Sequence, residues 1–162
     1  MRNAIDACRS VSLAAREIDD LVAIARRQLP ELDAITQGER RTSLATEAPE
    51  AAALLRAAGM EVRVDVRLPD VSAEADALLG WAVREGATNV LRHSRARTCS
   101  IVATRDGDRL LLELVNDGIG AGADAPGSGL SSLAERFAAA KGVVLGGRID
   151  GERFRLRVEL PA

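Results

Sequence analysis

The sequence predicts an α+β fold, a two-layer α/β sandwich with helices on one face of a mixed sheet, preceded by a long N-terminal helix. Two features of the pattern support this class. Segments with apolar residues at helical spacing are interspersed with short segments in which apolar and polar residues alternate. The expected order is helix, helix, strand, helix, strand, strand, loop, helix, strand, strand, and such an order segregates the helices to one face of a sheet.

The first predicted helix spans residues 12–37 and carries an apolar seam. Its seam residues recur at alternating spacings of four and three, as in a helix that packs on another helix. Pro30 interrupts the pattern and should kink or end the helix, because proline has no amide hydrogen to donate. Two interpretations stay open: the helix packs on its own domain, or it is half of a helical hairpin that dimerises. The seam consists of Ile18, Val22, Ala25, Leu29 and Leu32.

The remaining elements follow from periodicity and from turn residues. Gly59 provides a stop for a second helix at about 47–58. A long helix covers residues 73–93, and the sequence Asp106-Gly107-Asp108 predicts a turn between two strands. The other expected elements are strands at 61–68, 99–104, 109–115, 143–149 and 153–160, and a helix at about 130–140.

Composition and charge exclude several classes of function. The 162 residues suffice for one domain, and 47% apolar with 28% charged residues is an ordinary globular composition. A net charge of −2 provides no basic surplus for binding nucleic acid. No apolar run approaches the ~18–20 residues that span a bilayer, so no membrane contact is expected. Cys8 and Cys99 form no C-x-x-C pair, which fits a reducing cytoplasm.

The helix at 73–93 carries the first group of candidate functional residues. At about 100° per residue, Glu85, Asn89 and Arg92 share one helical face, and His93 lies about 80° from Glu85. A carboxylate can hold or activate water, and an amide oxygen suits Mg²⁺, which prefers oxygen ligands. Arginine and histidine could meet phosphate. Taken alone, this pattern also fits a solvated helix face with ordinary charges.

Two glycine-rich motifs follow. The first, Asn116-Asp117-Gly118-Ile119-Gly120-Ala121-Gly122, comes directly after an apolar strand. A short polar side chain at a strand end can hydrogen-bond a base edge, and glycines let the backbone approach a flat ligand. The second, Gly127-Ser128-Gly129-Leu130, opens a helix whose free amides and dipole attract phosphate. Taken alone, the first motif also fits a surface turn, and the second also fits a plain glycine-rich helix start.

In this order and spacing, the three motifs together resemble the Bergerat ATP-binding fold of the GHKL superfamily, which includes histidine kinases, type II topoisomerases and MutL. The sequence is most similar to sensor histidine kinases of the DesK and NarX type. Residues 84–94 resemble that family's N box, residues 127–136 resemble its second glycine box, and the strand from Phe154 to Pro161 is also similar. The resemblance covers residues 60–161 well and residues 16–59 more weakly.

The resemblance implies ATP and Mg²⁺ as cofactors and a role for each matching residue. Asn89 would ligate Mg²⁺, and Glu85 would organise water on the metal side as the catalytic residue. Arg92 and His93 would lie toward the phosphates. The glycines would pass close to the nucleotide and border an ATP lid at about 123–128, a short lid that matches the DesK type. The implied cofactor-binding residues are Asn89, Arg92, His93, Asn116, Asp117, Gly118, Gly120, Gly122, Gly127, Gly129 and Leu130.

The sequence departs from the family pattern at two places around the base. In the family's Asp-x-Gly-x-Gly motif the first aspartate accepts a hydrogen bond from the adenine amino group. Asn116 stands there instead, and Asp117 occupies the next position. An asparagine oxygen can still accept this bond, but it is neutral, so weaker adenine binding is expected. Arg153-Phe154 replaces a threonine that often precedes the last strand.

The third departure concerns the phosphate acceptor. His93 is the one histidine of the chain, and the resemblance assigns it to the nucleotide site. A histidine kinase also needs an accepting histidine on its first dimerisation helix, and residues 1–70 contain none. Either the sequence starts after that helix, or the protein is a degenerate relative. We therefore expect residues 1–46 to resemble the second helix of a dimerisation hairpin and residues 47–162 to form the ATP-binding catalytic domain.

These expectations define a leading function and two alternatives. The leading function is transfer of the ATP γ-phosphoryl group to a histidine on a separate segment or partner kinase chain, with a response regulator downstream. The domain would be cytoplasmic, its parent membrane-anchored, and a homodimer could form through the N-terminal helix. One alternative is a catalytically inactive nucleotide-binding regulatory module. The other is an anti-sigma-factor-type serine kinase, which shares the fold.

Overall fold

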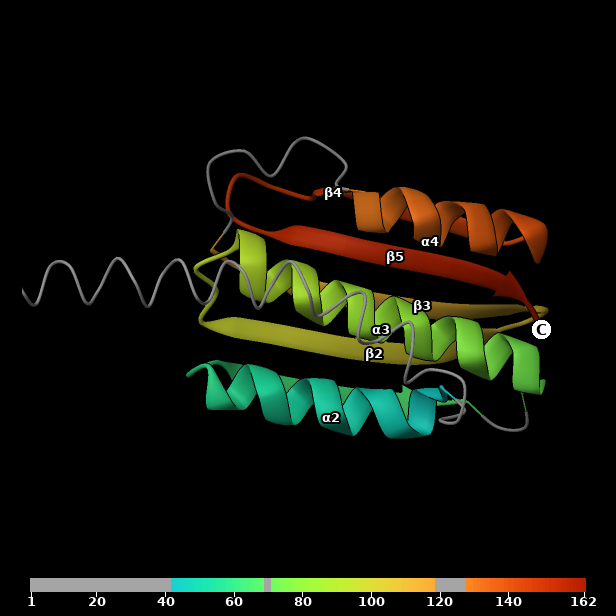
Figure 1. The fold of residues 1–162 in the computed structure, drawn as a ribbon, viewed down its shortest axis with the longest axis horizontal. Helices are drawn as coiled ribbons and strands as arrows, with labels where there is room; N and C mark the ends of the chain where they lie inside the picture. The colour runs from blue at the N-terminus through green and yellow to red at the C-terminus, as the bar shows by residue number, and fades with distance from the viewer. Residues whose placement is uncertain (1–41, 69–70, 119–127) are drawn as a thin grey trace, which may run out of the picture. The chain divides into compact units, whose positions relative to one another are not determined.

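A computed structural model describes residues 42–68, 71–118 and 128–162. In this part of the chain, three helices cover one face of a five-stranded mixed sheet (Figure 1). The predicted α+β sandwich is therefore confirmed. The elements are α2 (Leu44–Ala57), β1 (Glu61–Arg67), α3 (Ala73–His93), β2 (Thr98–Asp106), β3 (Arg109–Asn116), α4 (Ser128–Ala139), β4 (Val143–Arg148) and β5 (Phe154–Pro161).

The N-terminal helix predicted at 12–37 lies outside the described residues. The division of the chain into segments 1–46 and 47–162 stays a prediction. None of the helices in the described ranges is long and apolar enough to cross a bilayer.

The strands follow the order β1-β2-β3-β5-β4 in the sheet. Strands β1 and β2 pair in parallel, with α3 between them in the chain, and the other neighbours are antiparallel. Gly107 forms the β2–β3 turn with a φ of 59°, a left-handed conformation that glycine adopts without steric cost. At the β4–β5 turn, Asp150 Oδ1 accepts hydrogen bonds from the amides of Glu152 and Arg153. The turn predicted at Asp106-Gly107-Asp108 is therefore present, and a second turn that contains Asp150 joins β4 to β5.

The core lies between the sheet and the helices and is mainly aliphatic. Alternate residues of β2, β3 and β5 are buried against α3 and α4, as the period of two in a strand requires. Gly86 lets α3 approach the sheet, because a Cβ there would lie 2.7 Å from Cδ1 of Leu114. The largest fully buried side chains are Leu55, Leu79, Val83, Ile101, Leu110, Leu112, Leu114, Phe137, Val158 and Leu160.

Polar contacts fix the three helices relative to one another. Arg84 of α3 donates from Nε to Oε2 of the buried Glu47 on α2, at 3.0 Å, and the same pair is joined by a second hydrogen bond. On the other side of α3, the guanidinium of Arg136 lies 4.4 Å from the ring centroid of Trp81. These contacts hold α2 and α4 on either side of α3, which carries the first candidate motif.

Candidate nucleotide-binding site

The three predicted motifs meet at one end of the sandwich. Figure 1 shows the C-terminal end of α3, the C-terminal end of β3 and the N-terminal end of α4 on the same side of the domain. The chain direction explains this meeting, because α3 and β3 both run toward this end and α4 starts from it. Residues that are up to 45 positions apart in sequence, such as Glu85 and Leu130, therefore belong to one region.

Helix α3 presents the predicted N-box residues on its C-terminal turns. Glu85 and Asn89 are one turn apart and both are half-buried, whereas Arg92 and His93 are exposed in the last turn. Cationic groups in a last turn interact favourably with the helix dipole. The predicted helix and its end at His93 are confirmed, while the nucleotide-binding roles of these four residues stay predictions.

The Glu85 carboxylate lies directly against Gly129, in the first turn of α4. A Cβ added at Gly129 would overlap Glu85 Oε1 and would lie 2.5 Å from the carboxylate carbon. The missing side chain of Gly129 thus makes the room that this carboxylate occupies. Leu130, the next residue, is half-buried and packs against the core, close to Gly146 of β4. The structure therefore brings the N box against the second glycine motif.

Asn116 ends β3 and is buried, with 3% of its surface exposed. It continues the alternation of Leu112 and Leu114, so its side chain is on the helix-facing side of the sheet. Its Nδ2 donates a hydrogen bond to the main-chain oxygen of Asp117 at 2.6 Å. A buried amide at this strand end matches the place where the sequence analysis put the base contact.

Asp117 points to the backbone at the start of β2. Its Oδ1 accepts hydrogen bonds from the amides of Arg97 at 2.7 Å and Thr98 at 2.9 Å. Burial opposes the charged form of Asp117, but the amides of Thr98 and Arg97 outweigh it and hold the pKa of the carboxyl below its ordinary value. The motif places Asp117 among the expected nucleotide contacts, and its spacing does not predict these hydrogen bonds to the main chain.

Gly118 packs on the turn that follows α3. Its φ is 67°, its main-chain oxygen accepts from the amide of Arg95 at 2.7 Å, and a Cβ there would lie 2.5 Å from the Arg95 oxygen. Both the backbone conformation and the lack of space require glycine. The other predicted glycines, Gly120, Gly122 and Gly127, lie outside the described residues, as does nearly all of the expected lid.

Comparison with known proteins adds independent information. No family model matches the sequence. It is 26% identical over 165 residues to the sensor histidine kinase NarS of Mycobacterium tuberculosis, a match of 79% of this chain and 38% of that protein. The structure resembles the blue-light activated histidine kinase EL346 of Erythrobacter litoralis, with a TM-score of 0.61 at 19% identity, over 74% of this chain and 42% of that one.

A second solved structure, histidine kinase AdeS of Acinetobacter baumannii, matches with a TM-score of 0.60 at 14% identity, over 88% of this chain and 79% of that one. The described residues have the fold of a histidine kinase catalytic domain. Full-length ShkA in complex with AMPPNP also matches, at 25% identity and a TM-score of 0.55, over 70% of this chain and 28% of that one. The chain thus spans well under half the length of NarS, EL346 and ShkA.

In this histidine kinase fold, the donor set suits a magnesium ion that arrives with phosphate. Within the described ranges, no three or more His, Cys, Asp or Glu side chains are grouped so as to hold a metal by themselves. Mg²⁺ keeps several waters and takes one or two protein oxygens together with phosphate oxygens. The side-chain oxygens of Asn89 and Glu85, one turn apart on α3, fit that kind of site.

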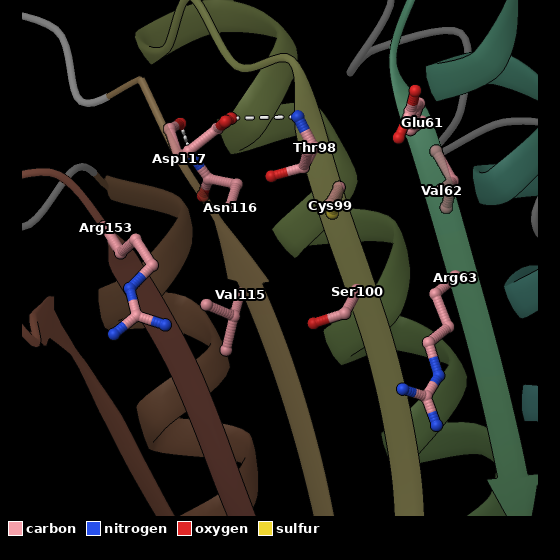
Figure 2. A pocket seen from close by; sticks show the side chains of 10 residues that line it. All are labelled: Glu61, Val62, Arg63, Thr98, Cys99, Ser100, Val115, Asn116, Asp117 and Arg153. Carbon is pink, nitrogen blue, oxygen red and sulfur yellow. Dashed lines mark hydrogen bonds between the residues drawn. The ribbon is translucent and has the colours of Figure 1, made fainter.

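The same end of the histidine kinase fold carries a depression of about 430 Å³ (Figure 2). Arg63 of β1 lines it, together with Ser100 and Val115, which alternate in β2 and β3 with the helix-facing Cys99 and Asn116. The depression therefore opens mainly on the sheet face away from the helices. Asn116 and Asp117 of the first glycine-rich motif also line it, so it adjoins the end of the sandwich where the three motifs meet.

Proposed function

We propose that this chain contains the ATP-binding catalytic domain of a sensor histidine kinase of the DesK and NarX type. The observation that carries the proposal is the contact of the Glu85 carboxylate with Gly129, at the end of the sandwich where β3 ends in the buried Asn116. The fold supports a kinase catalytic domain, and the three motifs supply groups suited to base, metal and phosphate.

The proposed roles follow from the chemistry of each group. Asn116 would accept a hydrogen bond from the adenine amino group through Oδ1. Asn89 and Glu85 would hold Mg²⁺, which when bound would neutralise charge on the phosphates during transfer. Arg92 and His93, exposed at the end of α3, would draw the phosphates toward that end by charge and hydrogen bonding. Rate enhancement would come mostly from positioning and electrostatics.

The accepting histidine would lie outside these 162 residues, because His93 is the one histidine of the chain and belongs to the proposed nucleotide site. Residues 1–46 would form part of a dimerisation hairpin, with residues 47–162 as the catalytic domain. A response regulator would receive the phosphoryl group, and the domain would work in the cytoplasm, where ATP is available, within a membrane-anchored parent.

A phosphotransfer assay tests the proposal. The chain is mixed with radiolabelled ATP, Mg²⁺ and a histidine-bearing dimerisation hairpin from a related kinase. We expect acid-labile phosphate on the hairpin, lost with Asn89→Ala and lost when the hairpin histidine is replaced by alanine. Absence of transfer at full occupancy by ATP would contradict kinase activity and favour a regulatory module.

That regulatory module is the second candidate, because the neutral Asn116 stands where the family pattern has an aspartate. It would bind nucleotide without transferring phosphate. The serine kinase alternative has a separate signature, since phosphoserine on a target would be stable to acid.

A further inference from the structure

We propose that Asp117 is a positioning residue that holds the end of α3 at a fixed place relative to Asn116, and so keeps the two halves of the nucleotide site at the spacing that ATP needs. The inference rests on the proposed function and deepens it. It assigns Asp117 a task different from base contact, which the order Asn-Asp-Gly alone does not distinguish.

Four hydrogen bonds join the segment after α3 to the end of β3, and we call them the clasp. Asp117 Oδ1 accepts from the amides of Arg97 and Thr98 at 2.7 and 2.9 Å. The Asp117 amide donates to the Thr98 oxygen at 3.3 Å, and the Arg95 amide donates to the Gly118 oxygen at 2.7 Å. The Asp117 side chain therefore supplies half of the bonds.

The side chains of the neighbours Asn116 and Asp117 have different partners at the end of β3. Successive residues of a strand alternate, and Asn116 is on the helix-facing side. Figure 2 shows the Asp117 carboxylate directed at the Thr98 amide, with the hydrogen bond drawn between them. For the carboxylate to reach a base on the helix side, both of its bonds to the main chain would have to break.

The segment held by the clasp is short and stiff. It leaves α3 directly after His93, and Ser94 Oγ donates to the Val90 oxygen at 2.7 Å while accepting from the Ala96 amide at 3.3 Å. Because of these bonds, a shift of residues 95–98 would also move the last turn of α3, where the proposed phosphate contacts lie. The clasp thus sets the distance between those contacts and Asn116.

Holding both contact regions at a fixed spacing raises affinity for a ligand that spans them. Once one half of the ligand is bound, the other half meets its site at a high effective concentration. A loosened clasp loses this advantage, whereas each half of the ligand still finds its own contacts. Asp117 should therefore affect the affinity for ATP and not the affinity for adenosine or for triphosphate alone.

The clasp needs an acceptor oxygen and does not need a charge. Both amides converge on the single atom Oδ1, and an asparagine oxygen can accept two hydrogen bonds at the same place. Asp117→Asn should therefore preserve the clasp, and Asp117→Ala should remove it. Asp150 offers a matched control, because its Oδ1 accepts from the amides of Glu152 and Arg153 at 2.9 and 2.8 Å in the β4–β5 turn.

The test measures dissociation constants for MgATP by calorimetry, and for adenosine and inorganic triphosphate by ligand-observed NMR. We expect Asp117→Ala to weaken MgATP roughly tenfold or more, the loss that follows from about 1.4 kcal/mol. Adenosine and triphosphate should keep their affinities, as should MgATP with Asp117→Asn and Asp150→Ala.

Three results would overturn the inference while leaving the proposed function intact: unchanged MgATP binding by Asp117→Ala, a parallel loss of adenosine binding, or equal weakening by Asp117→Asn. Failure of the wild type to bind MgATP would overturn the proposed function, and the inference with it. If Asp117→Ala does not fold, amide hydrogen exchange of the wild-type protein tests the clasp instead. The amides of Arg97 and Thr98 should exchange slowly in the free protein and still more slowly with MgATP bound. Rapid exchange of these amides both without and with MgATP would refute the clasp.

Discussion

Asn116 and Asp117 are neighbours in sequence, but the fold gives them opposite surroundings. The resemblance of their motif to that of the histidine kinases assigns both to the nucleotide, and the predicted strand ends at residue 115. The strand in fact includes Asn116, and alternation along the strand buries that side chain. The Asp117 carboxylate instead accepts hydrogen bonds from the main-chain amides of Arg97 and Thr98. A difference of one residue at a strand end thus decides which side chain is buried on the helix-facing side of the sheet.

Gly129 is the residue whose substitution tests the contact between α3 and α4. In Gly129→Ala the new methyl group would displace the Glu85 carboxylate, which can swing away because it ends a flexible side chain. We expect the protein to remain folded and MgATP binding, followed by calorimetry, to weaken roughly tenfold. Gly147→Ala is the control, since a Cβ there has nothing within 4 Å. Equal binding by both variants would contradict the proposed placement of Glu85.

The buried thiol of Cys99 should make the stability of the folded protein depend on pH. Burial, with a smaller contribution from the Asp117 charge, raises the pKa of its thiol from 9.0 to about 11. The folded state therefore favours the neutral thiol, so this group's contribution to stability is present below pH 9 and is lost between pH 9 and 11. In a Cys8→Ser background, iodoacetamide at pH 9 should label Cys99 only after urea is added. Rapid labelling of the folded protein would show that the thiol is accessible.

At the scale of elements, each predicted helix and strand within the described ranges coincides with an observed one to within three residues. The largest offset is at α2, which begins at Leu44 and not at residue 47. Ser43 is its N-cap and accepts a hydrogen bond from the Thr46 amide. Serine is a residue type that the N-cap position favours, so Ser43 is the sequence signal for this earlier start. Contacts between helices, such as Glu47 with Arg84, could not be predicted because they depend on how the helices pack.

The ion pair between α2 and α3 has a measurable effect on stability. Glu47→Gln removes the carboxylate that pairs with Arg84 in a largely buried setting, where the side chains are 7% and 32% exposed. Removing one partner of a buried pair costs about 3–5 kcal/mol, and the partial exposure of Arg84 reduces this to about 2 kcal/mol. Urea unfolding measures the loss. Glu50→Gln, at an exposed position of the same helix, should change the free energy of unfolding by less than about 0.5 kcal/mol.

At the scale of the whole molecule, the sequence predicts the class of fold and the three motifs but not the order of strands. The parallel pairing of β1 with β2, and the place of β5 between β3 and β4, depend on long-range packing. The motif residues could be named from their spacing, while the seating of the Glu85 carboxylate on Gly129 emerges only when α3 and α4 pack together.

The central claim is that the end of the sandwich where α3, β3 and α4 meet binds MgATP. Calorimetry with ATP, with and without Mg²⁺, on the wild type and on Asn89→Ala, tests it most directly. Thr88→Ala is the control, because the Thr88 hydroxyl bonds within the helix to the Arg84 oxygen. We predict magnesium-dependent binding that Asn89→Ala loses and Thr88→Ala keeps. No binding at millimolar ATP, or magnesium-independent binding unaffected by Asn89→Ala, would contradict the claim.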